Sequence, residues 1–307
     1  MANPSKPRKA ESSAGASFTP APWLVVLGLV VLTLIVHRNV LHEGFALDDL
    51  ILLQQAEGLR PWPLTLWRWL SGWAWFRIVF PVWGQEPFAY HVTSLLLHVL
   101  NAVLLQRLLR RAGASEVAAF LGTAVFALSR LHFPALLAAT SIGELLALTF
   151  TLAGLGFASQ AKRMPLAIVA MLLAVSAKES VLLVPFAWLL TARAEESIGA
   201  RVRRMAPMLL AGTIAGLVLL GSGLTSGRLG GQAYAVSFGA NLAENVARLF
   251  GWTFDLVDPI PDLHATTTGA APIVLPLLAL GLTALAAWRG SSLMRAGAVW
   301  WWLAVLP

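Results

Sequence analysis

Nine apolar runs separated by short polar segments constrain this chain more than any other feature of its sequence. They cover residues 23–36, 90–109, 117–128, 145–159, 165–177, 180–192, 205–224, 271–288 and 296–307. Of the 307 residues, 58% are apolar and 12% are charged, about half the charged share of an ordinary soluble domain. A single core cannot hide this much apolar surface, and in lipid only closed helices satisfy their own backbone. We therefore expect an all-α, polytopic transmembrane helix bundle with about eight to nine spans, not a soluble enzyme.

The ends of the chain refine this expectation. Residues 1–22 are polar and Pro-rich, and predict a disordered cytosolic tail before one transmembrane domain over residues 23–307. The first run has no small-x-small cleavage site after it, so we expect an uncleaved span. The last run has 12 residues, against about 20 for a span, which predicts a chain truncated at its C-terminus or a re-entrant segment. The four-residue spacing of Gly212 and Gly216 is typical of close packing between helices, and we assign these glycines no other role.

The lysines and arginines predict the orientation. With the N-terminus in the cytosol, 14 of the 22 basic residues fall in cytosolic segments and 11 of the 15 acids fall outside. The net charge of +7 is therefore a topology signal, and we expect no nucleic-acid partner. We expect an integral protein of a bacterial cytoplasmic membrane, with its polar chemistry on the outer face. The chain has no cysteine, so a disulfide or a thiolate metal site is excluded.

Two outer segments, residues 38–89 and 225–270, are each about 50 residues long. The first contains Trp62, Trp67, Trp69, Trp73, Trp75 and Trp83. Because Trp favours the membrane–water interface, we expect interfacial helices there. The second predicts a helix over residues 238–257. This segment also contains an acidic group that could form a metal or sugar site, but a solvated loop is the favoured interpretation, and we assign no metal ligands. The group consists of Asp255, Asp258, Asp262 and His264.

Asp48 and Asp49, soon after the first span, are the first candidate for chemistry. An ionised Asp near a membrane can take a proton from an attacking hydroxyl, while its neighbour orients it or holds a cation. The alternative is a solvated turn in which an Asp caps the following helix. From these two residues alone, the turn is the favoured interpretation.

A polar stripe on the second span is the next candidate. His91, Ser94, His98 and Asn101 are spaced by 3, 4 and 3 residues, which places them on one helix face. In lipid such a face must meet protein or a cavity, so interhelical hydrogen bonding and a role in a site are both open.

Charged residues at the outer ends of later spans complete the candidates. Arg130 could bind an anion or snorkel at the interface. His132 follows it at the outer end of the third span, and Glu144 lies at the start of the fourth. Lys178 and Glu179 split one apolar run, and basic residues on both sides of that run predict two short spans with a tight outer turn. This turn predicts either a pocket below the outer surface or a mutual ion pair.

These residues together resemble the GT-C superfamily of polytopic glycosyltransferases, most closely the protein O-mannosyltransferases and the membrane mannosyltransferases with C-terminal tetratricopeptide repeats. The resemblance covers about residues 23–200. It is carried by four motifs: Phe45-Ala-Leu-Asp48-Asp49; Pro87-Phe-Ala-Tyr90-His91 with Leu95-Leu-Leu-His98-Val-Leu-Asn101; Phe126-Ala-Leu-Ser129-Arg130-Leu131-His132; and Ala174-Val-Ser-Ala-Lys178-Glu179-Ser180.

The resemblance implies the chemistry. The donor would be a sugar on a polyprenyl phosphate, transferred with inversion to a hydroxyl of a protein or glycan acceptor beside membrane lipid. Asp48 or Asp49 would be the base, and Lys178 and Arg130 would bind the phosphate. His91, His132, Glu144 and Glu179 would complete the substrate site. No cofactor is required, although a divalent cation is compatible with such a site.

The sequence departs from the family pattern at two positions where a residue needed for activity is expected. Pro134 stands where relatives often have Glu, and Ile142 stands where an Arg is frequent; the tetratricopeptide repeats are absent. A non-catalytic GT-C-like membrane scaffold therefore remains an alternative. A transporter or lipid-carrier flippase is another, but it predicts an internal repeat, which the sequence does not show.

Overall fold

The computed structural model describes residues 22–190, 196–227, 240–253 and 271–305, and these ranges contain helices and turns but no strand. The α-helices are α1 (Pro22–His37), α2 (Leu47–Glu57), α3 (Trp75–Trp83), α4 (Pro87–Arg111), α5 (Glu116–Leu128), α6 (Phe133–Leu137), α7 (Ile142–Ala158), α8 (Met164–Ala177), α9 (Val184–Ala187), α10 (Ile198–Thr225), α11 (Ala240–Thr253), α12 (Ala271–Arg289) and α13 (Ser292–Val305). Short turns join them: η1 (Arg38–His42), η2 (Trp69–Ala74), η3 (Arg130–His132), η4 (Ala139–Ser141), η5 (Ala161–Arg163), η6 (Glu179–Val181) and η7 (Trp188–Leu190). The expected all-α class is confirmed for this part of the chain.

The expected number of spans is not met. Within the described residues, four helical segments are long and apolar enough to cross a membrane, by length and composition: Pro87–Arg111, Ala139–Ala158, Ile198–Thr225 and Pro272–Arg289. The other apolar runs also form helices at the predicted places, but these helices are shorter. α5 has 13 residues and α8 has 14, roughly 20 Å each at 1.5 Å per residue, against a hydrocarbon core of about 30 Å. The described residues therefore show four candidate spans and not the eight to nine that the apolar runs predicted.

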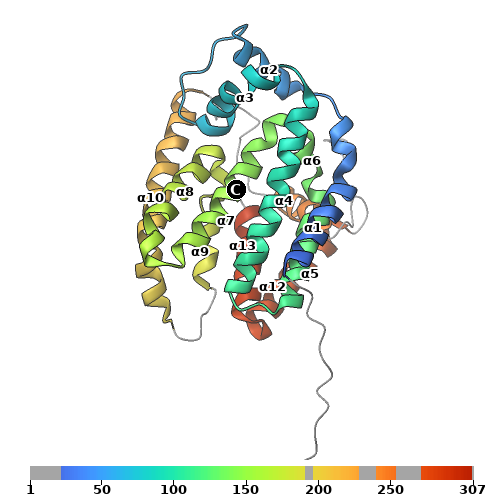
Figure 1. Cartoon of the computed structure of the whole chain (residues 1–307). Helices are drawn as coiled ribbons and strands as arrows, with labels where there is room; N and C mark the ends of the chain where they lie inside the picture. The colour runs from blue at the N-terminus through green and yellow to red at the C-terminus, as the bar shows by residue number, and fades with distance from the viewer. Residues whose placement is uncertain (1–21, 191–195, 228–239, 254–270, 306–307) are drawn as a thin grey trace, which may run out of the picture.

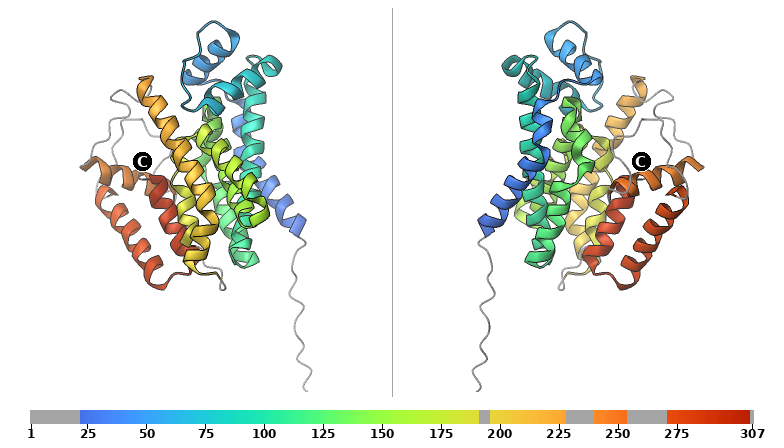
Figure 2. Two further views of the ribbon diagram at one scale, coloured as in Figure 1. Left: turned by 90° about the vertical axis from the view of Figure 1, so that its left-hand side faces the viewer. Right: turned by 90° about the vertical axis from the view of Figure 1, so that its right-hand side faces the viewer.

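The long helices run side by side, and the first outer segment covers one end of them (Figure 1). α7 packs between α4 and α8, and α8 packs against α10. α2 and α3 lie together at one end, which we call the outer end, while α1 begins toward the opposite end. Figure 2 shows α12 and α13 as a pair of neighbouring helices at one side of the bundle, with α11 across them.

Among the described residues, three apolar clusters pack the bundle, and the third of them joins α11 and α12. At the outer end, Phe76 of α3, Tyr90 of α4 and Ile142 of α7 are all buried in one cluster. The second cluster fills the contact between α8 and α10. A Cβ at Gly212 would lie 2.6 Å from Cγ of Met171, and one at Gly216 would lie 2.8 Å from Cδ1 of Leu182. A side chain at either position would require Met171 or Leu182 to shift, which supports the predicted packing role of both glycines.

The first outer segment, which contains the six tryptophans, forms helices as predicted. It contains α2, the π-helical turn η2 and α3. α3 packs on the bundle by one face only, because Phe76 and Val79 are buried while the apolar side chains of Ile78 and Val82 are 70% and 77% exposed. In the second outer segment, α11 lies within the predicted helix. The acidic group of residues 255–264 and the N-terminal tail of residues 1–21 lie outside the described residues.

Candidate functional site

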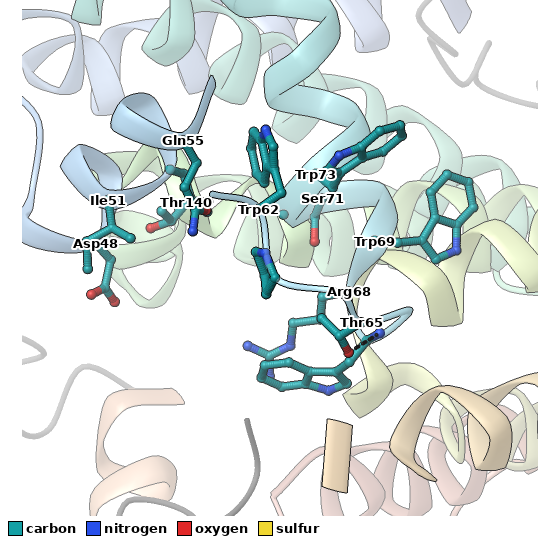
Figure 3. A pocket seen from close by; sticks show the side chains of 14 residues that line it. Asp48, Ile51, Gln55, Trp62, Thr65, Arg68, Trp69, Ser71, Trp73 and Thr140 are labelled. Atoms are coloured by element: carbon teal, nitrogen blue, oxygen red, sulfur yellow. Dashed lines mark hydrogen bonds between the residues drawn. The ribbon is translucent and has the colours of Figure 1, made fainter. Parts of the chain in front are cut away.

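A cavity of about 270 Å³ lies at the outer end, between α2, residues 62–73 and η4. Its polar lining comes from Asp48, Gln55, Thr65, Arg68, Ser71 and Thr140, and its aromatic lining from Trp62, Trp67, Trp69 and Trp73. Figure 3 shows Asp48 on one side of Trp62 and Arg68 on the other. A few polar groups converging on an aromatic-lined space are typical of a small-molecule site.

The two adjacent aspartates have different environments. Both lie in the first turn of α2, where the helix dipole favours a carboxylate. Asp49 is 0% exposed: its Oδ2 accepts from the backbone N–H of Ala46 at 2.9 Å, and its Oδ1 accepts from that of Thr140 at 2.7 Å. Asp48 is exposed and lines the cavity. Of the two aspartates, Asp48 lines the cavity, whereas Asp49 is buried, caps α2 and ties it to η4.

Residues 59–68 reach from α2 to α10 and η6 and form one wall of the cavity. The backbone N–H of Leu66 donates to Oγ of Ser222 at 2.8 Å, and Thr65 Oγ1 lies 3.1 Å from the same oxygen. Arg68 has a positive φ of 52°, a conformation that L-residues rarely adopt. Its guanidinium lies 4.1 Å from the centroid of the Trp67 ring, in cation–π geometry.

Two ion pairs lie beside this wall. Arg68 Nε donates to Glu179 Oε2 at 2.8 Å, and Arg68 Nη2 donates to Glu179 Oε1, so the pair is bidentate. Lys178 Nζ lies 2.8 Å from Glu144 Oε1. The mutual Lys178–Glu179 ion pair that the sequence left open does not form. The reason is that each side chain meets an opposite charge from another element, Glu144 from α7 and Arg68 from the outer segment.

Glu179 is charged at neutral pH. Burial alone would raise the pKa of its carboxyl group, but the hydrogen bonds and the positive charge of Arg68, together with the charge of Lys178, outweigh burial and lower that pKa. The two ion pairs together form a cluster of two positive and two negative side chains: Arg68, Lys178, Glu144 and Glu179. Its net charge is zero, and neither cation is bare.

Of the polar stripe on α4, the side chains of His91, His98 and Asn101 make hydrogen bonds to the backbone of other segments. His91 is buried, with Nδ1 3.3 Å from the carbonyl oxygen of Leu136 and Nε2 3.1 Å from that of Glu43. Asn101 donates to the carbonyl oxygen of Leu145 and accepts from Thr149 Oγ1. His91 does not line the cavity, so the structure places it among packing residues and not with Asp48.

A group of three imidazole rings lies apart from the cavity. His132 is 4.7 Å from His98, and His98 is 5.3 Å from His37, measured between ring centroids. Burial and the charges of these two neighbours lower the pKa of His132 to about 3, so the ring is neutral at physiological pH. The side chain of Arg130 lies outside what the structure describes. Within the described ranges, no group of three or more His, Asp or Glu side chains is arranged to hold a metal ion.

Sequence reasoning missed Arg68 and the aromatic lining. The Trp residues were assigned to the membrane interface because of their residue type, yet four of the six line the cavity. One signal was present in the sequence: Arg68 lies between Trp67 and Trp69 in an outer segment, where the charge pattern predicts few basic residues.

Comparisons with known proteins identify no relative: no protein-family model, no curated protein sequence and no solved structure matches this chain.

Proposed function

We propose that this protein is a membrane glycosyltransferase of the GT-C type, which moves a sugar from a polyprenyl-phosphate donor to an acceptor hydroxyl at the outer face. The observation that carries the proposal is that the exposed residue Asp48 lines the edge of the Trp-lined cavity. A carboxylate, an amide and hydroxyl groups beside indole rings suit a sugar, which presents hydroxyls at its edge and apolar C–H groups on its faces.

In this proposal Asp48 is the general base. It takes the proton of the acceptor hydroxyl while the hydroxyl oxygen attacks C1 of the donor sugar from the face opposite the phosphate. The bond between C1 and the acceptor oxygen forms, the bond between C1 and the phosphate oxygen breaks, and the phosphate leaves with the electron pair. A single displacement of this kind inverts the configuration at C1.

Asp49 has a supporting role in the same proposal. Its two oxygens accept from backbone N–H groups on both sides of the start of α2, at Ala46 and Thr140. These bonds hold the turn that carries Asp48, which lines the cavity. The sequence left the base as Asp48 or Asp49, and the burial of Asp49 supports Asp48.

The phosphate of the donor would meet the cations beside the cavity wall. Negative charge develops on the phosphate as the sugar departs, and a nearby cation stabilises that charge more than the ground state. Lys178 and Arg68 are the described candidates, and Arg130 remains a proposed third. The donor would arrive through the membrane, so no nucleotide site is needed.

The test is transfer itself. The purified full chain is incubated with polyprenyl-phosphate sugars that differ in the sugar, and release of polyprenyl phosphate is measured. Asp48→Asn should reduce turnover about 10²-fold or more, because a positioned base contributes on that scale.

The matched control is Glu57→Gln, at the opposite end of the same helix, where the exposed carboxylate accepts from Gln85. This variant should retain normal turnover. Release of lipid phosphate at equal rates by wild type and Asp48→Asn would refute the assigned base. Absence of release from every donor would refute the proposed transfer.

A membrane scaffold is the second candidate, because both cations beside the cavity are already neutralised by carboxylates. A scaffold predicts that Lys178→Met and Lys178→Met/Glu144→Leu change only the stability of the fold, and only slightly, because the Glu144 side chain is 43% exposed to water. A glycosyltransferase predicts loss of turnover in both variants.

A further inference from the structure

The Lys178–Glu144 ion pair lies directly behind the cavity wall. Ser71, which lines the cavity, donates from Oγ to the carbonyl oxygen of Ala177 at 2.7 Å. A Cβ placed on Gly143 would lie 3.0 Å from that carbonyl oxygen and 3.0 Å from Ser71 Oγ. The residues next in sequence to Ala177 and Gly143 are Lys178 and Glu144. One tight three-way contact therefore places this ion pair next to the cavity-lining chain.

The two ion pairs of the cluster differ in how firmly they are held. The Arg68–Glu179 pair is bidentate, and its side chains are 24% and 19% exposed. The planar guanidinium matches both carboxylate oxygens, which makes this pair geometrically specific. Lys178 instead offers a compact charge to one oxygen of Glu144, whose side chain is 43% exposed. Glu144 can thus leave Lys178 for water at low cost, whereas Glu179 is fixed by Arg68.

We infer that Glu144 is an exchangeable counter-ion that competes with a phosphate ester for Lys178. When a phosphate group enters, its oxygen replaces Glu144 Oε1 on Lys178 Nζ, and the carboxylate of Glu144 turns to solvent. When the phosphate leaves, Glu144 returns and keeps the cation paired. The exchange weakens the binding of phosphate and promotes its release. Its role for a lipid phosphate product rests on the proposed function, but the anion exchange itself does not.

The charge of the ligand determines how well it competes. A phosphate monoester carries about −1.5 to −2 at pH 7, more than the single charge of a carboxylate. It can therefore displace Glu144, while a neutral lipid cannot. The ligand class assigned to Lys178 is accordingly a phosphate monoester, either on a lipid or free.

The experiment measures binding without any sugar. Dodecyl phosphate is titrated into the purified full chain in dodecyl maltoside micelles, with dodecanol as the neutral probe and inorganic phosphate as the tail-free probe. Glu144→Gln should lower the Kd for dodecyl phosphate about fivefold, the ratio expected for removal of an ion pair at the upper end of the exposed range. Lys178→Met should abolish the gain, and Lys178→Met/Glu144→Gln should match Lys178→Met.

Glu116→Gln is the matched control, because Glu116 also forms an exposed ion pair, with Arg110, but at the other end of the bundle. It should leave the Kd unchanged. Equal tightening of inorganic phosphate and dodecyl phosphate by Glu144→Gln would identify the phosphate group alone as the ligand, and tightening of dodecyl phosphate only would identify a lipid. Both results support the exchange.

A Kd that is unchanged or raised in Glu144→Gln would overturn the inference, even if sugar transfer is found. Tightening by Glu144→Gln without transfer from any sugar donor would instead retain the exchange and reject the proposed glycosyltransferase. The two claims can therefore fail separately.

Discussion

Replacing Asp49 tests the division of roles between the two aspartates. Asp49 is fully buried, and each carboxylate oxygen accepts one backbone N–H, from Ala46 at 2.9 Å and from Thr140 at 2.7 Å. In Asp49→Asn the side chain keeps one oxygen, and its NH2 group then faces the second donor. One charge-assisted hydrogen bond is lost and a buried N–H is left without a partner, which amounts to about 2–3 kcal/mol of unfolding free energy.

The assay is unfolding of the purified protein in mixed micelles with increasing SDS, followed by Trp fluorescence. The matched control is Asp48→Asn, one residue away on the exposed side of the same turn, which should change stability by less than about 0.5 kcal/mol. The reasoning would be refuted if Asp49→Asn were as stable as Asp48→Asn. In that case the two backbone N–H groups would have other partners, and the burial of Asp49 would not explain its presence.

Three further perturbations test other parts of the structure. Gly143→Ala should lower stability by about 1–3 kcal/mol in the same SDS assay, because its Cβ would crowd Ala177 and Ser71; an unchanged midpoint would mean that this contact is loose. Arg204 and Arg201 lower the pKa of Glu196, so the stability from this pairing is present above the ordinary pKa of 4.5 and is lost as pH falls through the lowered value. The difference in stability between wild type and Glu196→Gln should therefore disappear in acid, and a difference that grows instead would reverse the assigned sign. In the cysteine-free chain, Arg203→Cys should resist a membrane-impermeant thiol reagent in intact cells while Glu57→Cys reacts, and labelling at position 203 would overturn the orientation.

The sequence alone determined where the helices lie. The apolar runs at residues 23–36, 117–128 and 165–177 correspond within a few residues to α1, α5 and α8. These boundaries follow from local chemistry, because apolar runs, N-caps and charged residues act on their own turn of helix. Ser115, for example, accepts from the backbone N–H of Ala118 and begins α5, and the charged Lys178-Glu179 pair ends α8 where the apolar run is interrupted.

The length of the spans was less predictable from the sequence. A run of apolar residues shows that a helix avoids water, but it does not show whether lipid or protein covers that helix. α8 is short and lies between α7 and α10, so part of its apolar surface is covered by protein. A count of full spans from apolar runs therefore exceeded the four helical segments that meet the length of a membrane core.

Only the tertiary structure decided which polar residues act together. Glu179 meets Arg68, which is 111 residues away, and Lys178 meets Glu144, which is 34 residues away, although Lys178 and Glu179 are adjacent in the sequence. The tertiary structure also gives Asp48 and Asp49 different environments, and it places four tryptophans in the lining of one cavity. The physical reason is that ion pairs and cavity linings depend on side chains that distant elements bring within a few ångströms. Residue type and spacing along one segment carry no information about those partners.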